Sequence, residues 1–193
     1  MKNSFWIIFA VIAVIALWCI NAYNGLVGVQ EEATQSAADV QSAYQRRADL
    51  IPNLVEVVKG YAAHEKETFE AVVNARSKAT QMTIDPSNCT PEQLQKYQQA
   101  QGELGSALGR LIAISENYPE LKANENFRDL QTQLEGTENR INEARNKFNG
   151  KVTDYNKKRR SFPTVILAGM FGFDSMAKFE ADPSAQSAPQ VKF

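Results

Sequence analysis

Histidine and cysteine are scarce in this sequence, whose 193 residues include one His and two Cys. His64-Glu65 begins like a zinc-protease motif, but position 68 is Thr, so the second imidazole of that motif is missing. Neither Cys19 nor Cys89 has a His beside it, and a nucleophilic Cys needs such a base. We therefore predict no metal site, and no cysteine nucleophile unless two chains share a site.

Net charge is almost absent too, because 21 Lys and Arg residues face 22 Asp and Glu residues. A near-zero charge lacks the electrostatic footprint of a nucleic-acid binder, so no nucleic-acid partner is predicted. No Gly-rich phosphate loop is present, since Gly102, Gly105 and Gly109 lie inside a helical stripe, where they permit close helix approach. The sequence offers no catalytic residues, cofactor site or small-molecule substrate, and we do not predict an enzyme.

A long apolar run is present and covers residues 5–20. With its flanking residues it reaches about 20 residues, enough for a transmembrane helix. A cleaved signal peptide is the alternative, but only Lys2 precedes the run and no small-x-small cleavage site follows it. Trp18 before Cys19 is too bulky for a lipoprotein signal. We predict an uncleaved, single-pass anchor that is integral to the membrane.

Basic residues near the anchor predict its direction. Lys2 and the α-amino group precede the run, whereas residues 21–45 contain Glu31, Glu32 and Asp39 and no basic residue. The N-terminus is therefore expected in the cytoplasm, and the rest of the chain on the extracytoplasmic side.

The first stripe of apolar or small residues at helical spacing covers residues 26–82. Only Arg47 and the His64-Glu65 region interrupt it. Pro52 would normally end a helix, yet the phase runs through it unchanged, so we favour one long helix kinked at Pro52. A break with Asp49 as a new N-cap is the alternative.

Two further stripes, at residues 94–118 and 127–155, follow a loop at residues 84–91. Thr90 is the expected N-cap of the second helix, and Asn124 or Asn126 that of the third. The predicted fold is all-α: an N-terminal transmembrane helix, then an antiparallel up-and-down bundle of three long helices plus a short C-terminal helix.

Charged residues gather around Pro52, where carbonyls freed by the missing N–H accept hydrogen bonds from Arg side chains. We interpret this group as a structural polar network, with a partner-binding groove as the alternative. Its candidate members are Arg46, Arg47, Asp49, Pro52, Glu138 and Arg140.

Four basic residues, Lys157, Lys158, Arg159 and Arg160, end the third helix, where cations suit the helix dipole. They are candidate contacts to anionic lipid, a solvated last turn being the alternative. The strongly apolar segment after them needs cover from the bundle, a neighbouring chain or a bilayer; we rank protein packing before membrane insertion. Its candidate oligomer or membrane contacts are Val165, Ile166, Leu167, Met170, Phe171 and Phe173.

Two motifs occur in order at a specific spacing: RRADLIPNLV at residues 46–55 and YPELKANENF at residues 118–127. With Tyr23-Asn24-Gly25 and Phe171-Gly172-Phe173, they resemble the LemA family of bacterial membrane-anchored proteins over nearly the whole chain. The resemblance implies a single N-terminal transmembrane segment, an antiparallel helical bundle and no enzyme activity. We therefore expect a bacterial inner-membrane protein with its body on the periplasmic side.

Four parts are expected: an anchor at 1–24, a LemA-like helical bundle at 25–163, an apolar segment at 164–180 and a mobile tail at 181–193. The tail is rich in Pro, Ser, Ala and Gln. Its terminal Val191 and Phe193 are candidates for docking to a carboxylate-binding module such as a PDZ domain.

Two functions fit these parts. The first is a non-enzymatic scaffold that forms homo-oligomers through its long helices and organises or shapes the membrane. The second is a monomeric binding module or accessory subunit that presents its bundle or tail to an envelope protease, sensor or enzyme. We favour the first, because the membrane-proximal part of the first helix has no obvious cover within the chain.

Overall fold

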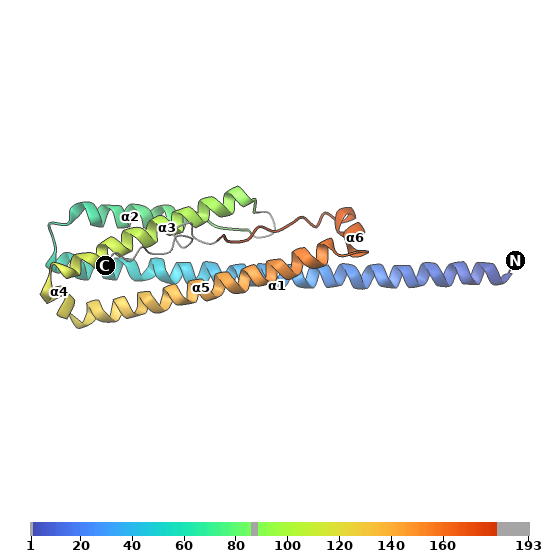
Figure 1. The fold of residues 1–193 in the computed structure, drawn as a ribbon, viewed down its shortest axis with the longest axis horizontal. Helices are drawn as coiled ribbons and strands as arrows, with labels where there is room; N and C mark the ends of the chain where they lie inside the picture. Colours follow the sequence, from blue (N-terminus) through green and yellow to red (C-terminus); the bar gives the residue numbers. More distant parts are fainter. Residues whose placement is uncertain (1, 86–88, 181–193) are drawn as a thin grey trace, which may run out of the picture.

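The computed structural model describes residues 2–85 and 89–180, and their regular structure is entirely helical. Six α-helices and one short 3₁₀ turn follow one another along an elongated molecule (Figure 1). The elements are α1 (Lys2–Tyr61), α2 (Lys66–Gln81), α3 (Pro91–Ala113), η1 (Ile114–Glu116), α4 (Pro119–Ala123), α5 (Glu125–Arg160) and α6 (Thr164–Met170). The predicted all-α class, with its long apolar N-terminal helix and short C-terminal helix, is confirmed.

The first helix is longer than its neighbours, with 60 residues and a length of about 90 Å. It passes through Pro52 without interruption, so the alternative break at Asp49 is wrong. It ends at Tyr61, however, and a turn at residues 62–65 reverses the chain into α2. The prediction of one helix continuing to Met82 is therefore wrong beyond Tyr61.

The reversal has a physical reason in the apolar face of α2. Phe69, Val72, Ala75 and Ala79 are all buried, and they pack in the same core cluster as Ile51 of α1. A straight continuation of α1 would leave that face without a partner, whereas the turn removes it from water. The interruption of the stripe at His64-Glu65 was the sequence signal for this turn.

Four long helices, rather than three, therefore alternate in direction along the bundle (Figure 1). The two main pairs are α1 with α5 and α2 with α3. This topology returns the end of α5, together with α6, to the part of the bundle from which the apolar end of α1 emerges (Figure 1).

The core consists of two clusters. The one far from the anchor joins α1, α2 and α3 with Leu121 and Phe127. The one near the anchor joins α1 and α5 with the start of α3 and the chain after α6. Leu26 and Ala33, in the membrane-proximal part of α1, are fully buried in the second cluster. The expected lack of intrachain cover for this part of α1 is therefore wrong. With four alternating helices, α5 runs back toward the anchor, and α5 and the chain after α6 cover this part of α1.

Capping side chains fix the starts of α3 and α5. Thr90 Oγ1 accepts a hydrogen bond from the Gln93 backbone N–H (3.2 Å), and the Gln93 side chain accepts one from the Thr90 N–H (2.9 Å). The Asn124 side chain accepts from the Phe127 N–H (3.0 Å), so Asn124 rather than Asn126 is the N-cap of α5.

Replacing Thr90 with Ala is expected to lower the free energy of unfolding by about 1 kcal/mol, because the N–H of Gln93 loses its acceptor at the exposed start of α3. Urea titration of the full chain in mild detergent, followed by circular dichroism, measures the change. Thr132→Ala, inside α5 beyond its first turn, is the matched control and should not destabilise, since Ala is the better helix former there. Equal losses in both variants would contradict the capping role.

Candidate functional site

The end of the bundle from which α1 emerges combines the features that bear on function. Among the described residues, α1 is the one helix long and apolar enough, by length and composition, to cross a membrane, and none of its most apolar window is buried. Its large side chains from Trp6 to Ile20 are exposed to varying degrees, as expected of a helix that lipid would surround.

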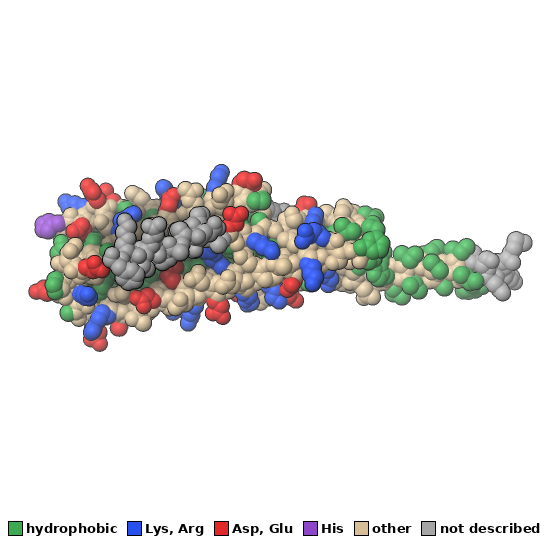
Figure 2. Space-filling model, viewed as in Figure 1, with side chains coloured by type: hydrophobic (Ala, Val, Ile, Leu, Met, Phe, Trp, Pro, Cys, Tyr) green, Lys and Arg blue, Asp and Glu red, His purple; other side chains and the backbone are tan. Residues whose placement is uncertain are grey.

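A group of exposed apolar side chains, which we name the collar, lies beside the point where α1 leaves the bundle. Figure 2 shows these hydrophobic side chains gathered at the base of the projecting apolar helix. Their exposed fractions range from 44% to 82%. The collar consists of Phe162, Val165, Ile166, Met170 and Phe171.

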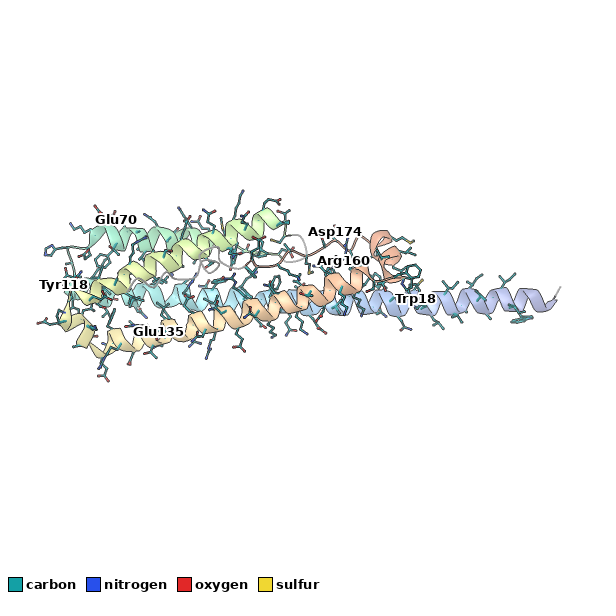
Figure 3. The ribbon with its side chains drawn as sticks, in the orientation of Figure 1. Trp18, Glu70, Tyr118, Glu135, Arg160 and Asp174 are labelled. Atoms are coloured by element: carbon teal, nitrogen blue, oxygen red, sulfur yellow. The ribbon has the colours of Figure 1, made fainter. Side chains whose placement is uncertain are left out.

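The opposite side of α6 holds the collar in place. Leu167 and Ala168 are buried against the bundle, and the Tyr23 ring of α1 packs edge-on against Phe171 (5.1 Å between ring centroids) and Phe173 (5.6 Å). Aromatic residues such as Tyr prefer the interface between membrane and water. The collar therefore lies at the level where the apolar part of α1 ends, close to Trp18 (Figure 3).

The six predicted oligomer or membrane contacts thus divide into two groups. Leu167 and Phe173 face the protein, whereas Val165, Ile166, Met170 and Phe171 are exposed. The segment therefore has buried residues that suit packing on protein and exposed residues that suit contact with a membrane or a second chain.

The basic run at the end of α5 also divides. Arg159 Nε donates to the Phe173 carbonyl, and Lys158 is half-buried against Gly25 of α1. Lys157 and Arg160 are exposed at the same end of the bundle, where Figure 3 labels Arg160. Two of the four predicted lipid contacts therefore brace the fold, and two remain available to an anionic surface.

A buried arginine links three helices in the middle of the bundle. Arg47 of α1 is 3% exposed, and it pairs with Glu138 Oε1 of α5 at 3.0 Å. Its Nη2 donates to the backbone carbonyl of Gln101 of α3 (2.9 Å) and to the side-chain oxygen of the same residue (2.6 Å). The Arg47 guanidinium also lies over the Tyr44 ring, 5.1 Å from its centroid. The structure thus brings together two of the six predicted network members and adds Gln101.

Tyrosines make the surroundings of this arginine apolar. The rings of Tyr44 and Tyr97 pack edge-on at 5.5 Å, and burial raises the pKa of both hydroxyls. Glu138, by contrast, keeps 42% of its side chain in contact with solvent. The network is therefore a buried cation with one half-exposed anionic partner, which suits a structural role better than proton transfer.

The remaining predicted members lie elsewhere. Arg46, Asp49 and Arg140 line a shallow surface groove between α1 and α5, together with Asp39 and Lys147, which form an ion pair at 2.7 Å. A second pair between these helices joins Lys151 to Glu32 at 2.7 Å, and that hydrogen bond lowers the pKa of the Glu32 carboxyl. These exposed pairs set the register of α1 against α5 more than they stabilise it.

The carbonyl that Pro52 leaves without a helical hydrogen bond has a donor that the sequence did not predict. Because a proline lacks an N–H, the carbonyl of Ala48, four residues earlier, receives no helical hydrogen bond from it. Arg76 of α2 donates its Nε to this carbonyl at 2.8 Å. The freed acceptor is therefore used by an arginine, as expected, but by one on a neighbouring helix.

An extended segment at residues 173–180, which we name the strap, follows α6 and runs along α5 toward the far end of the bundle (Figure 1). Phe173, Met176 and Phe179 are buried, each by more than 90%. Phe179 packs edge-on against Phe148 of α5 at 5.4 Å, with the Arg145 guanidinium 5.1 Å from its ring centroid.

Two asparagines of α5 bind the strap backbone in the same way. Asn156 donates to the Met176 carbonyl (2.9 Å) and accepts from the Met176 N–H (3.1 Å). Asn149 does the same with Phe179, at 2.9 Å in each direction. Further side-chain donors to strap carbonyls are Tyr155 to Asp174 (2.7 Å), and Gln98 of α3 (2.8 Å) and Arg145 (2.9 Å) to Glu180.

Four residues of these contacts were not predicted from the sequence: Arg76, Gln101, Asn149 and Asn156. The asparagines carried a signal, since they lie seven residues apart on one face of a predicted helix. Val191 and Phe193, the predicted docking residues of the tail, lie outside the described residues. Within residues 2–85 and 89–180, no three His, Cys, Asp or Glu side chains form a group that could hold a metal ion.

Comparisons with known proteins agree on one family. The model of the LemA family matches residues 36–193. The magnetosome protein MamQ of Magnetospirillum gryphiswaldense is 29% identical, over 88% of this chain and 70% of MamQ. Magnetosome protein MamQ 2 of Paramagnetospirillum magneticum is 27% identical, over 86% and 67% of the two chains. Protein LemA of Metamycoplasma hominis is 25% identical, over 94% and 80%.

Proposed function

The chain belongs to the LemA family, and from this premise we propose that it is a non-enzymatic scaffold whose copies self-associate and organise or shape the bacterial inner membrane. In this proposal α1 anchors the chain in a single pass, and the bundle stands on the periplasmic side. The names of its MamQ relatives, which refer to the magnetosome, favour a membrane role.

The collar is the observation that carries the proposal. Complete burial of one such side chain contributes about 1.5–3 kcal/mol. Five partly exposed side chains at the level of Tyr23 therefore favour contact between the base of the bundle and the membrane interface. Lys157 and Arg160 add attraction to anionic headgroups, about 1 kcal/mol for each basic residue near the surface.

This arrangement explains how the bundle would act on the membrane. A transmembrane helix alone would leave the body free to tilt, whereas α6 at the interface holds the long axis upright and occupies area in one leaflet only. Many copies close together would thus add area to that leaflet and favour curvature.

The first test concerns the depth of the collar. In a background with Cys19→Ala and Cys89→Ala, a fluorescent label on Met170→Cys is expected to be quenched by spin-labelled lipid in vesicles containing phosphatidylglycerol. The same label on Val73→Cys, an exposed position on α2, should not be quenched. Equal quenching at both sites, or none at either, would contradict the placement of α6 in the interface.

The second test concerns self-association and membrane shape. Energy transfer between labelled copies in vesicles should exceed that of randomly diluted monomers, and electron microscopy should show vesicles of altered curvature. Ile166→Asp with Met170→Asp should abolish the change of shape, whereas Val73→Asp should not. Monomeric protein in unaltered vesicles would reject the scaffold and favour the alternative, a monomeric accessory subunit that presents its bundle or tail to an envelope protein.

A further inference from the structure

The strap lies in a site that is built to bind extended chain. Asn149 and Asn156 are seven residues apart, which is about 10.5 Å along a helix. Met176 and Phe179, the residues that they bind, are three apart, which is about 10 Å along an extended chain. Because the two repeats coincide, successive asparagines of α5 each meet a backbone amide of the strap.

Recognition in this site has a backbone part and a side-chain part. The asparagine amides bind the N–H and C=O of single strap residues, which any extended peptide offers. Buried Phe173, Met176 and Phe179 occur at every third position and provide the selectivity. The groove beside α5 is therefore a peptide-binding site, and the chain's own strap is its ligand.

We propose that this groove also receives the strap of a second copy of the chain, so that neighbouring molecules in one membrane associate by exchanging residues 173–180. The inference deepens the self-association under the proposed function and rests on it. A second copy is the occupant that fits, because its strap has the same sequence and satisfies every contact just described.

The position of the anchor favours such an exchange. Each strap starts beside α6 at the membrane-facing end and runs away from the anchor (Figure 1). Copies anchored in the same membrane therefore present their straps and grooves at one height and in one direction. Gly172, with φ of +72°, lies directly before the strap and tolerates a change of chain direction that other residues would resist.

The exchange depends on the surface density of the protein. A tethered strap meets its own groove at an effective concentration of the order of millimolar, so a dilute molecule keeps its own strap bound. Confinement in a membrane raises the concentration of neighbouring straps to a level that competes. The exchanged state has the same contacts as the unexchanged one. The fraction of exchanged molecules therefore depends on how densely the protein is packed in the membrane, and not on additional binding energy.

The test uses two full-length variants that complement each other. The strap variant, Met176→Asp with Phe179→Asp, has an intact groove but a strap that cannot enter it. The groove variant, Asn149→Ala with Asn156→Ala, has an intact strap but lacks four hydrogen bonds to it, which should weaken binding by about 30-fold or more. With different affinity tags in mild detergent, the mixture is expected to give a one-to-one complex that neither variant forms alone.

The same two variants also give the result that would overturn strap exchange. If both keep the helical circular dichroism of the wild type but pair no more in the mixture than alone, strap exchange is overturned. Should the groove variant not fold, a dye-labelled peptide of residues 172–180 replaces it. This peptide should bind the strap variant at least 10-fold more tightly than it binds the wild type, and equal binding would overturn the proposal.

The outcome is separable from that of the proposed function. Collar depth is read from lipid quenching in vesicles, whereas strap exchange is read from pairing in detergent. Pairing without quenching would contradict the interfacial role of α6 and support the exchange; quenching without pairing would do the reverse.

Discussion

Replacing Arg47 with Ala is expected to lower the free energy of unfolding by about 3 kcal/mol, because the change breaks a buried charge network and leaves its partners without a donor. The Gln101 side-chain oxygen loses a 2.6 Å hydrogen bond in the core, and Glu138 loses its ion pair. The truncation also leaves a cavity between α1, α3 and α5, which adds to the loss. Urea titration of the full chain in mild detergent, followed by circular dichroism, measures the difference.

Two further variants separate charge from geometry. Arg47→Lys keeps the charge, but a single ammonium cannot reproduce the fork that serves both Glu138 and Gln101, so an intermediate loss is expected. Arg46→Ala, at the adjacent exposed position, is the matched control and should change stability by no more than about 0.5 kcal/mol. If Arg47→Ala were no more destabilising than Arg46→Ala, the network would have no structural role.

Periodicity and caps in the sequence predicted most of the architecture. The stripes that became α3 and α5 needed only local information, because Thr90 and Asn124 cap them and Pro163 follows the end of α5. The stripe over residues 26–82 could not be divided in this way. The interruption at His64-Glu65 marked the place of the turn, but apolar residues resume at helical spacing beyond it. What reverses the chain there is the burial of α2 against α1 and α3, a tertiary effect that periodicity does not report.

The candidate sites show the same limit. Glu138 and Arg140 were named as candidate members of the network around Pro52, and the structure pairs Glu138, but not Arg140, with Arg47. The stripe placed Arg47, and not Arg46, on the apolar face of the first helix, and in the structure Arg47 faces α3 and α5 whereas Arg46 faces solvent. The third member of the network, Gln101, was not foreseen, since it depends on how α3 packs against α1. The C-terminal apolar segment contains both exposed collar residues and buried residues, because α6 has a buried and an exposed side. The sequence could not separate the two groups, since the run is short and contains no polar residue that would mark the exposed side.

Arg76 is expected to matter only as long as Pro52 is present. Arg76→Ala should lower the free energy of unfolding by about 2 kcal/mol, because the Ala48 carbonyl lies in a buried part of α1 and would lose its donor. Pro52→Ala returns a helical N–H to the same carbonyl. In the Arg76→Ala background, Pro52→Ala should therefore recover most of the lost stability. In the wild type Pro52→Ala should give no such gain, because the Ala48 carbonyl already accepts a hydrogen bond from Arg76.

A double-mutant cycle measures this dependence as a coupling free energy, expected to be at least about 1 kcal/mol, from urea titrations of the two single variants and the double variant. Lys78→Ala on the same helix is the matched control, since its side chain is 68% exposed and lies near Glu103 of α3 instead of α1. Its effect should add to that of Pro52→Ala within about 0.5 kcal/mol. Simple additivity of Arg76→Ala and Pro52→Ala would mean that Arg76 contributes through its packing on α1, and that the carbonyl freed by the proline is satisfied by solvent.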